Sequence, residues 1–490
     1  MRTNTVMKNF LEPGAVAVVG ASRRGLKEES FNPLEYMVQF GYQGKIYPIN
    51  PNADELFGLK SYPKLEDVPG EVDLAVITLP RNSLPQAVKE CVEKDIKSII
   101  IYTQGLADAD EQGESIQSEI VEIARAGGAR ILGPNTLGII NVFNNFHTVF
   151  AHVEGGRKLP LAVVSQSGIF MVRSFLKWVQ VGQAPLGKLV DLGNACDIDH
   201  ADVLEYLEDD PDIKVIVLYI EGIKNGRRFL EVARRVTKKK TILALKMGRS
   251  EQAARVVASH TGSLAGRDEV YDAVFRQCGI IRAEDLDEMD DLTQAFLNLP
   301  PMRGKRVAMF SHMGSVCSMG TDACGKHGLE MAELSLETVE RLHGFFPHWM
   351  PIRNPIDFWL AAMGHGYKRV YQQIFEALLE DKNVDAVACL APAFPEYYDS
   401  INPIEIIKQT TARFNKPVLV FVYGPLWMQR KVELEESNRV LACTSLDEAM
   451  KALAALLRYS QLNEQVSKVV EIDDAGDREG LSFQLEKITP

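Results

Sequence analysis

Residues 15–25 read AVAVVGASRRG, a run of small and β-branched apolar residues that ends in a glycine-containing turn. An uninterrupted apolar run of this kind is typical of a strand that is buried on both faces, as in a parallel sheet covered by helices. The same pattern recurs along the chain, at residues 45–52, 73–80, 98–105, 161–168, 214–222, 241–248 and 306–315. The sequence therefore predicts an α/β protein built from doubly wound parallel sheets.

With 490 residues, the chain is long enough for about three domains of ordinary size. The recurring pattern predicts a first domain at 1–148, a second at 149–300 and a third at 301–462. A polar, acidic tail follows at 463–490, and residues 300–304, Pro-Pro-Met-Arg-Gly, form a linker between the last two domains. These two domains open with similar strand–turn–helix segments, which favours similar folds for both.

Composition excludes several classes of function. The net charge is −12, from 54 basic and 66 acidic residues, and no long basic run occurs. Nucleic acid and membrane are therefore not expected as partners. The seven cysteines contain no CxxC pair, which favours reduced thiols over a disulfide framework or a bound metal. Because no apolar run has the length of a signal core or a membrane span, we expect a cytoplasmic protein.

The turn after the first strand has features of a phosphate site. Gly20, Ala21, Ser22 and Arg23 bring backbone N–H groups and a cation to the start of the next helix, an arrangement that suits a phosphate or pyrophosphate. The alternative is a tight turn without a ligand. A shared crevice at the ends of neighbouring strands would also be lined by Thr78, Pro80 and Gln104.

A nicotinamide cofactor is disfavoured at this crevice. The fingerprint GxGxxG is absent, and the second strand ends in Pro48-Ile49-Asn50-Pro51, with no acidic residue in the position that binds a ribose. Coenzyme A fits better, because it offers a pyrophosphate but makes no demand for that acidic residue.

Two further turns carry hydroxyl groups and glycine directly before a helix. The first consists of Ser165, Gln166, Ser167 and Gly168, and the second, at 311–315, contains Gly314 and Ser315. The free N–H groups and the positive dipole at a helix start can hold an anion. Taken singly, each turn is better explained as an ordinary serine cap. Two such helix starts that face one histidine would instead form a phosphate clamp.

The candidate histidine is His260, in the stretch Ser-His-Thr-Gly-Ser-Leu-Ala-Gly at 259–266. Histidine is more often a packed polar residue than a nucleophile, but these flanking residues are too small to form a conventional core. They allow a bulky anion to reach the imidazole, which is a good nucleophile toward phosphorus. Glu221, at the end of a buried strand, can accept the second imidazole N–H and fix its tautomer, unless it is simply a solvated strand-end residue.

Eight motifs in order carry a resemblance to a known family. They are VVGAS at 18–22, YPINP at 47–51, GPN at 133–135 with LG at 137–138, VSQSG at 164–168, LGN at 192–194, YIEGI at 219–223, SHTGSLAG at 259–266 and NPID at 354–357. Over residues 8 to 460, the chain resembles the α subunit of ADP-forming acyl-CoA synthetases, which are relatives of succinyl-CoA synthetase.

The resemblance implies a CoA-binding Rossmann-like domain followed by two flavodoxin-like domains. It implies that His260 is phosphorylated, that Glu221 stabilises it, and that both helix starts bind phosphate. Residues of the shared motifs that would bind CoA include Asn50, Pro51 and Asn135. The substrates would be a small carboxylic acid and its acyl-CoA. A separate ATP-grasp β subunit would supply the sites for ADP or ATP and Mg²⁺, in an α2β2 complex.

The chain also departs from the family pattern. Thr136 stands where the family usually has cysteine, and His312, Met313 and Ser315 crowd a turn that is usually richer in glycine. Phe358-Trp359-Leu360 is bulkier than expected, which favours an acyl group larger than acetate. The altered turn and the missing nucleotide domain leave an alternative open, a non-catalytic protein that binds or senses CoA or acyl-CoA.

Overall fold

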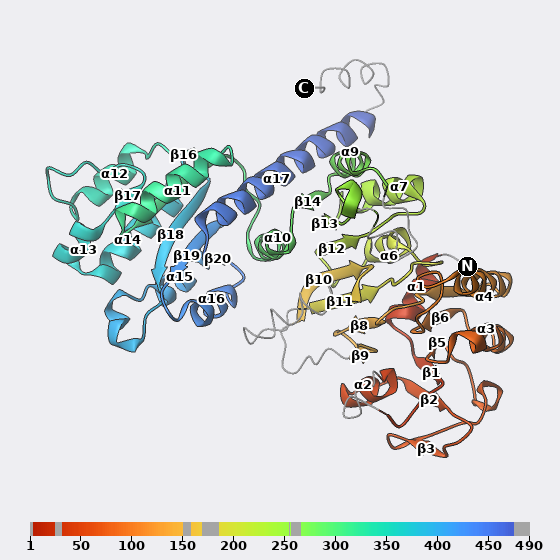
Figure 1. The fold of residues 1–490 in the computed structure, drawn as a ribbon. Coiled ribbons are helices and arrows are strands. Elements are labelled where there is room, and N and C mark those ends of the chain that lie inside the picture. The colour runs from red at the N-terminus through yellow and green to blue at the C-terminus, as the bar shows by residue number, and fades with distance from the viewer. Residues whose placement is uncertain are drawn as a thin grey trace. The chain divides into compact units, whose positions relative to one another are not determined.

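A computed structural model describes residues 3–24, 32–149, 158–168, 186–253, 255 and 266–474 (Figure 1). The chain divides into two compact units, Met1–Asp290 and Asp291–Pro490. His260 and the helix expected after Gly168 lie outside the described residues. Each unit is built around parallel sheets with helices against them, which confirms the predicted α/β class.

The first sheet of unit 1 is wholly parallel. Its strands lie in the order β2 (Lys45–Ile49), β1 (Ala15–Val19), β5 (Leu74–Ile77), β6 (Ser98–Ile101) and β7 (Arg130–Leu132). Its helices are α1 (Thr3–Leu11), α2 (Pro33–Gln39), α3 (Leu84–Glu93) and α4 (Glu111–Ala126). The strand order reverses direction between β1 and β5, and such a switch point is where open α/β sheets bind ligands.

The second sheet of unit 1 has five parallel strands and an antiparallel edge. The order is β14 (Ile281–Ala283), β13 (Thr241–Lys246), β12 (Val215–Ile220), β10 (Lys158–Ser165), β11 (Leu186–Asp191), β8 (Ile139–Asn141) and β9 (Phe146–His147). Its helices include α6 (His200–Leu207), α7 (Gly226–Val236), α9 (Asp268–Cys278) and α10 (Leu286–Asn298). The switch point lies between β10 and β12. Although β8 and β9 precede residue 148, they extend the second sheet.

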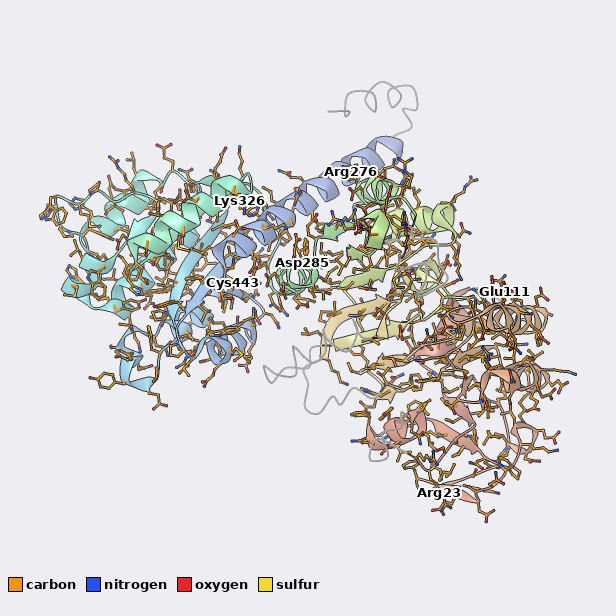
Figure 2. All side chains as sticks on the ribbon, viewed as in Figure 1. Arg23, Glu111, Arg276, Asp285, Lys326 and Cys443 are labelled. Carbon is orange, nitrogen blue, oxygen red and sulfur yellow. The ribbon has the colours of Figure 1, made fainter. Side chains whose placement is uncertain are left out.

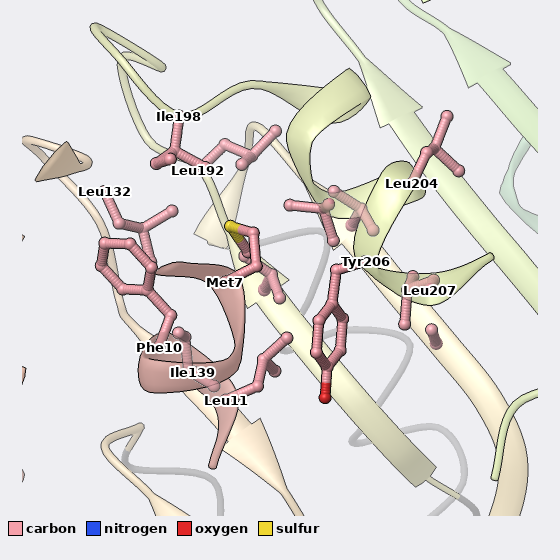
Figure 3. Close-up of a cluster of buried hydrophobic side chains, with 14 of the residues drawn as sticks. Met7, Phe10, Leu11, Leu132, Ile139, Leu192, Ile198, Leu204, Tyr206 and Leu207 are labelled. Carbon is pink, nitrogen blue, oxygen red and sulfur yellow. The ribbon is translucent and has the colours of Figure 1, made fainter. Parts of the chain in front are cut away.

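One hydrophobic core joins the two sheets of unit 1. Met7, Phe10 and Leu11 of α1 are fully buried in a cluster with residues of both sheets (Figure 3). The same cluster takes in Leu132 from the end of β7 and Leu204 from α6. Because this core is continuous, the carboxyl edges of the two sheets have fixed positions relative to each other.

Unit 2 contains a third parallel sheet with a similar strand order. The strands are β16 (Glu330–Met331), β15 (Arg306–Ser311), β18 (Ala386–Pro392), β19 (Val418–Tyr423) and β20 (Leu441–Cys443), and β17 (Ile356–Asp357) pairs with the end of β15. Its helices include α11 (Gly314–Lys326), α12 (Leu336–His343), α13 (Trp359–His365), α14 (Tyr367–Glu380), α15 (Ile404–Thr411), α16 (Trp427–Glu435) and α17 (Leu446–Asp474).

The last helix is longer than the sequence pattern indicates. An amphipathic stretch ends near residue 459, yet α17 continues through residues expected to begin the tail and ends at Asp474. No glycine or proline occurs between 460 and 474, so nothing in the local sequence stops the helix there. No helix in the described part of the chain is long and apolar enough to cross a membrane.

Candidate functional site

At the switch point of the first sheet, the turn after β1 lies directly against the turn after β5. Thr78 Oγ1 donates a hydrogen bond of 3.0 Å to the Gly20 carbonyl oxygen. Gly20 has a φ of +86°, and a Cβ there would lie 2.8 Å from the Leu79 side chain and 3.1 Å from Thr78 Oγ1. Glycine therefore permits both the left-handed backbone and the close approach of the two turns.

Side chains from two other elements hold the turn after β1. Asn50 Nδ2 donates to the Ala21 carbonyl oxygen at 2.7 Å. Asn32 Nδ2 donates to the carbonyl oxygens of Ser22 and Arg24, both at 2.9 Å, while its Oδ1 caps α2. The sequence analysis missed Asn32, although an asparagine before Pro33 is a recognisable helix start.

The remaining residues predicted for this crevice lie at the same edge of the sheet. Arg23, the last residue of the turn, is exposed (Figure 2), and Pro51, Pro80 and Gln104 are exposed as well. The structure thus brings the predicted residues of the first sheet together around one switch point. A mostly exposed rim with a cation beside a glycine turn can bind a phosphorylated ligand.

Asn194, which follows β11, connects the first sheet to the second. Its Nδ2 donates to Asp108 Oδ1 at 2.8 Å and to Gln117 Oε1 at 3.0 Å. Asn135, with a φ of +58°, donates through its own Nδ2 to Asn194 Oδ1 at 3.3 Å. Asn194 belongs to the LGN motif but was not predicted as a site residue, since its partners lie 59 to 86 residues away.

At the switch point of the second sheet, Gln166 ties the turn after β10 to the end of β12. Gln166 Oε1 accepts hydrogen bonds from the backbone N–H groups of Glu221, at 2.7 Å, and Gly222, at 3.0 Å. Glu221 is only 5% exposed, so the interpretation of it as a solvated strand-end residue is wrong. Ser165 Oγ accepts a hydrogen bond from Ser167 N at 2.9 Å and donates one to the Ser167 carbonyl oxygen at 2.8 Å. These two bonds fix the shape of the turn.

Asp191 is a buried carboxylate beside this turn that the sequence analysis did not single out. It pairs in register with Ser165, and its Oδ2 accepts a hydrogen bond of 2.6 Å from Leu137 N. A Cβ at Gly168 would lie 3.4 Å from Asp191 Oδ2, so the carboxylate lies against the turn. Burial raises its pKa to about 6, and the charge of Glu221 adds to that rise.

Thr136 explains one departure from the family pattern. Its hydroxyl donates to the Asp191 carbonyl oxygen at 2.5 Å and accepts from Gly138 N at 2.9 Å. The residue is 4% exposed. A hydroxyl suits this position because it both donates and accepts strongly, whereas a thiol does each weakly.

Lys246, at the end of β13, adds a positive group to the same edge. Its ammonium lies 4.6 Å from the centre of the Tyr271 ring, and Tyr271 OH accepts a hydrogen bond of 3.1 Å from Ile223 N. Burial lowers the pKa of Lys246 to about 8, although the charges of Asp268 and Glu221 act in the opposite direction. A buried ammonium and two buried carboxylates therefore lie at the carboxyl edge of one sheet.

The corresponding turn of unit 2 differs from the one at 165–168. The cap residue of α11 is Met313, which makes no side-chain capping bond, so the interpretation of this turn as a serine cap is wrong. Ser311 Oγ accepts from Met313 N at 2.9 Å, two residues on, as Ser165 Oγ does from Ser167 N. A Cβ at Gly314 would lie 2.9 Å from Asp357 Oδ2. A carboxylate therefore already lies beside the first residue of α11, where it opposes the approach of an anion.

The residues around that turn have structural contacts of their own. His312 Nδ1 lies 3.2 Å from Tyr367 OH, and its ring packs beside Phe358. The Asn354 side chain accepts a hydrogen bond from Met309 N and donates to the carbonyl oxygens of Val307 and Ala332. It therefore connects β15 to the segment that follows β16 rather than facing a ligand. Trp359 is 49% exposed.

Nothing in the described part of the chain groups three His, Cys, Asp or Glu residues as metal ligands.

The raised pKa of Asp191 predicts a stabilising substitution. Asn in its place keeps an acceptor for Leu137 N but removes the buried charge. The cost of that charge is absent below the unfolded-state pKa of 3.8, grows up to the folded-state pKa of about 6 and is constant above it. Asp191→Asn should therefore stabilise the chain above pH 6, by up to about 3 kcal/mol. Calorimetric unfolding between pH 4 and pH 8 measures this, and a constant difference from the wild type would contradict it.

Comparison with known families covers both sheets of unit 1. Residues 14–142 match a CoA binding domain, and residues 158–296 match a succinyl-CoA ligase like flavodoxin domain. The first match contains the switch point at Gly20 and Thr78, and the second contains the turn at 165–168 together with Glu221. The predicted CoA-binding class of the first sheet is thereby confirmed.

Full-length relatives extend the match to unit 2. The α subunit of acetate–CoA ligase [ADP-forming] II from Pyrococcus furiosus is 38% identical, over 92% of this chain and 97% of that protein. Acetate–CoA ligase [ADP-forming] II from Archaeoglobus fulgidus is 36% identical, over 93% of this chain and 67% of that protein. A solved structure, the dinucleotide forming acetyl-coenzyme A synthetase 1 of Ca. Korarchaeum cryptofilum in complex with phosphate and ADP, gives a TM-score of 0.83.

That structure is 31% identical in sequence and is matched over 94% of this chain and 98% of its own length. The family resemblance inferred from the eight motifs is thus confirmed by sequence and by fold. The chain belongs to the family of ADP-forming acetate–CoA ligase α subunits, which are acid–thiol ligases.

Proposed function

We propose that the chain is the α subunit of an enzyme that reversibly converts acyl-CoA, ADP and phosphate into a carboxylic acid, ATP and CoA. The observation that supports this proposal most strongly was made at the switch point of the second sheet. There Gln166 holds the turn at 165–168 against the buried Glu221, within a chain of the CoA-ligase family. This arrangement places an anion-binding turn beside a carboxylate that can orient an imidazole.

CoA binds at the carboxyl edge of the first sheet. Its pyrophosphate lies on the backbone N–H groups of the turn at 20–23, with Arg23 as the nearby cation. The residues Asn50, Pro51, Thr78, Pro80, Gln104 and Asn135 line the crevice. The thioester end reaches the second sheet along the loop at 133–138, which is bonded to Asp191 and Asn194.

Chemistry begins with inorganic phosphate on the turn formed by Ser165, Gln166, Ser167 and Gly168. A phosphate oxygen attacks the thioester carbonyl carbon, the C–S bond breaks, and the phosphate proton passes to the departing thiolate. The products are an acyl phosphate and free CoA. Positioning and charge neutralisation by the turn supply most of the rate, as is usual where phosphate reacts. The other predicted phosphate turn, at Gly314 and Ser315, is given no role in this step, because the Asp357 carboxylate lies beside it.

His260 then takes the phosphoryl group. Its ring nitrogen attacks phosphorus, the bond between phosphorus and the acyl oxygen breaks, and the carboxylate leaves. Glu221 accepts the other ring N–H and steadies the positive charge that develops on the imidazole. The glycine-rich segment at 259–266 lies outside the described residues, and its composition suits a loop that presents the phosphohistidine to a second site.

The second site belongs to a partner. An ATP-grasp β subunit holds ADP or ATP with Mg²⁺, in a cytoplasmic α2β2 complex. In support, the Pyrococcus relative is named an α subunit and matches this chain over 97% of its length, whereas the Archaeoglobus relative is longer and matches over 67%. The alternative of a non-catalytic CoA sensor is less well supported, because these relatives carry the names of ligases.

Production of ATP tests the proposal. The chain, mixed with an ATP-grasp β subunit, should form ATP from acyl-CoA, ADP and phosphate, and either protein alone should not. Acetyl-CoA is compared with longer and aryl acyl-CoA, because the bulky sequence at 358–360 predicts a larger acyl group, although Phe358 itself is buried in the core. CoA binding without phosphate-dependent loss of the thioester from any of these substrates would instead support a CoA-sensing protein.

A charge-neutral change at Glu221 tests its proposed role. Glu221→Gln keeps the size of the side chain and the backbone N–H groups that bond to Gln166, but removes the negative charge. We expect phosphorylation of the chain by acyl-CoA and phosphate to slow by about 10- to 100-fold, without loss of folding. Rapid-quench labelling measures the rate, and circular dichroism checks the fold. Labelling at the wild-type rate would remove Glu221 from the mechanism.

A further inference from the structure

Two buried carboxylates flank the turn proposed to bind phosphate. Asp191 ends β11 and Glu221 follows β12, and these strands lie on either side of β10, which leads into the turn. Asp191 is 1% exposed and Glu221 is 5% exposed. A dianion on this turn would be repelled by both charges, and in a buried site that repulsion is weakly screened.

Two backbone N–H groups donate to the carboxylate of Asp191. Oδ2 accepts from Leu137 N at 2.6 Å, and Oδ1 receives a long contact of 3.5 Å from Gly193 N. The titratable groups that interact with it are Glu221 after β12 and Tyr102 at the end of β6. Burial raises the pKa of Tyr102, which therefore stays neutral, so only the charge of Glu221 favours a proton at Asp191. A carboxylate offers about four acceptor positions, and a P–O–H group is a suitable further donor.

We propose that Asp191 and a phosphate bound at 165–168 share one proton, so that the turn selects a protonated oxyanion and rejects sulfate. The inference rests on the proposed function, because it assumes that phosphate occupies this turn. When Asp191 is ionised, it accepts a hydrogen bond from the hydroxyl of monohydrogen phosphate. Sulfate has no proton to donate at neutral pH and meets only the repulsion of the carboxylate.

The shared proton has a consequence for the dependence on pH. Asp191 is mostly ionised above pH 6, given its pKa of about 6, so binding of sulfate must then be accompanied by uptake of a proton. By linkage, the affinity for sulfate should fall by up to about tenfold for each pH unit above 6. Phosphate brings its own proton, and monohydrogen phosphate and ionised Asp191 both become more abundant above pH 6, so its affinity should not fall over that range.

The test is calorimetric titration of the whole chain with inorganic phosphate and with inorganic sulfate, at pH 6, 7 and 8. In the wild type we expect the affinity for sulfate to weaken by about 50-fold from pH 6 to pH 8, since Asp191 is already about half ionised at pH 6. In Asp191→Asn, whose amide needs no proton, the affinity for sulfate should be nearly independent of pH. Asp209→Asn is the matched control, because it removes an exposed carboxylate before β12, at the opposite edge of the same sheet. It should behave as the wild type does.

A measurement of catalytic turnover distinguishes failure of this inference from failure of the proposed function. Inhibition by sulfate of the phosphate-dependent loss of thioester should follow the same pH dependence as binding. A wild type that binds phosphate and discriminates against sulfate as described, but does not turn over, would support the inference and contradict the proposed enzyme. Sulfate affinity in the wild type that does not change with pH, or an unchanged pH dependence in Asp191→Asn, would overturn the inference alone. Absence of phosphate binding would overturn both.

Discussion

Replacing His260 with alanine is expected to abolish covalent phosphorylation of the chain. When acyl-CoA and labelled phosphate are supplied, the wild type should acquire a label that is lost in acid and stable in alkali, as a phosphohistidine is. The reason is that a methyl side chain offers no nucleophile to the acyl phosphate. Gel autoradiography after acid and alkali treatment measures the label, and ATP formation with the partner should stop in the same variant.

A control is needed because any histidine could in principle carry the label. His343, at the end of α12 in unit 2, is exposed, and alanine in its place should leave labelling unchanged. CoA binding by His260→Ala should also persist, since the residues proposed to bind CoA come from the first sheet and its loops. Persistence of the acid-labile phosphate in His260→Ala would refute the role assigned to this residue.

The second large effect is expected at Gly193, which follows β11. Its φ is +52°, and a Cβ there would overlap the carbonyl oxygens of Pro134 and Asn135. These are backbone atoms, so a side-chain rotation cannot relieve the overlap, and the loop at 133–138 must move. We expect Gly193→Ala to destabilise unit 1 by more than about 3 kcal/mol and to weaken CoA binding at least about tenfold.

Gly58 provides the matched control for Gly193→Ala. It also has a positive φ, +78°, but a Cβ there would meet nothing within 4 Å. Gly58→Ala should therefore show only the cost of the left-handed backbone, about 1 to 2 kcal/mol. Differential scanning calorimetry and CoA titration compare the two variants. Equal destabilisation by both would show that the contact between the loops at 133–138 and 191–196 contributes little.

The chemistry-bearing residues that the sequence revealed share one property, which is that they follow strands. Gly20, Thr78 and Glu221 each come directly after a run of buried residues, and parallel strands place their carboxyl ends at one edge. A one-dimensional pattern therefore sufficed to predict that these residues meet at an edge. It also sufficed for the α/β class, because continuous apolar strands that alternate with helices have few other arrangements.

The residues that the sequence analysis missed act across long separations. Asp191 contacts Leu137, 54 residues away, and Asn194 contacts Asp108, 86 residues away, in a loop of the first sheet. Neither residue stands out locally, since an Asp or Asn after a strand is typical of many turns. The second sheet also takes its edge strands β8 and β9 from residues before 148, because the pairing of β8 with β11 completes that sheet.

The two phosphate turns illustrate the same limit. The turns at 165–168 and 311–315 look alike in sequence, and the expectation for both was a serine cap. In the structure, Gln166 bonds to the end of β12, whereas Asp357 approaches the first residue of α11 from β17. The partner that each turn meets decides its electrostatic character, and that partner is 43 to 56 residues away.

The sequence by itself determined the strands, their glycine turns and the family, because local periodicity and short motifs involve only residues that are close together in the sequence. Tertiary structure alone decided which carboxylates converge on a turn and what the pKa of Asp191 becomes. Burial and proximity are properties of packing between distant segments, and at Asp191 they change an ordinary acid into one that holds its proton up to about pH 6.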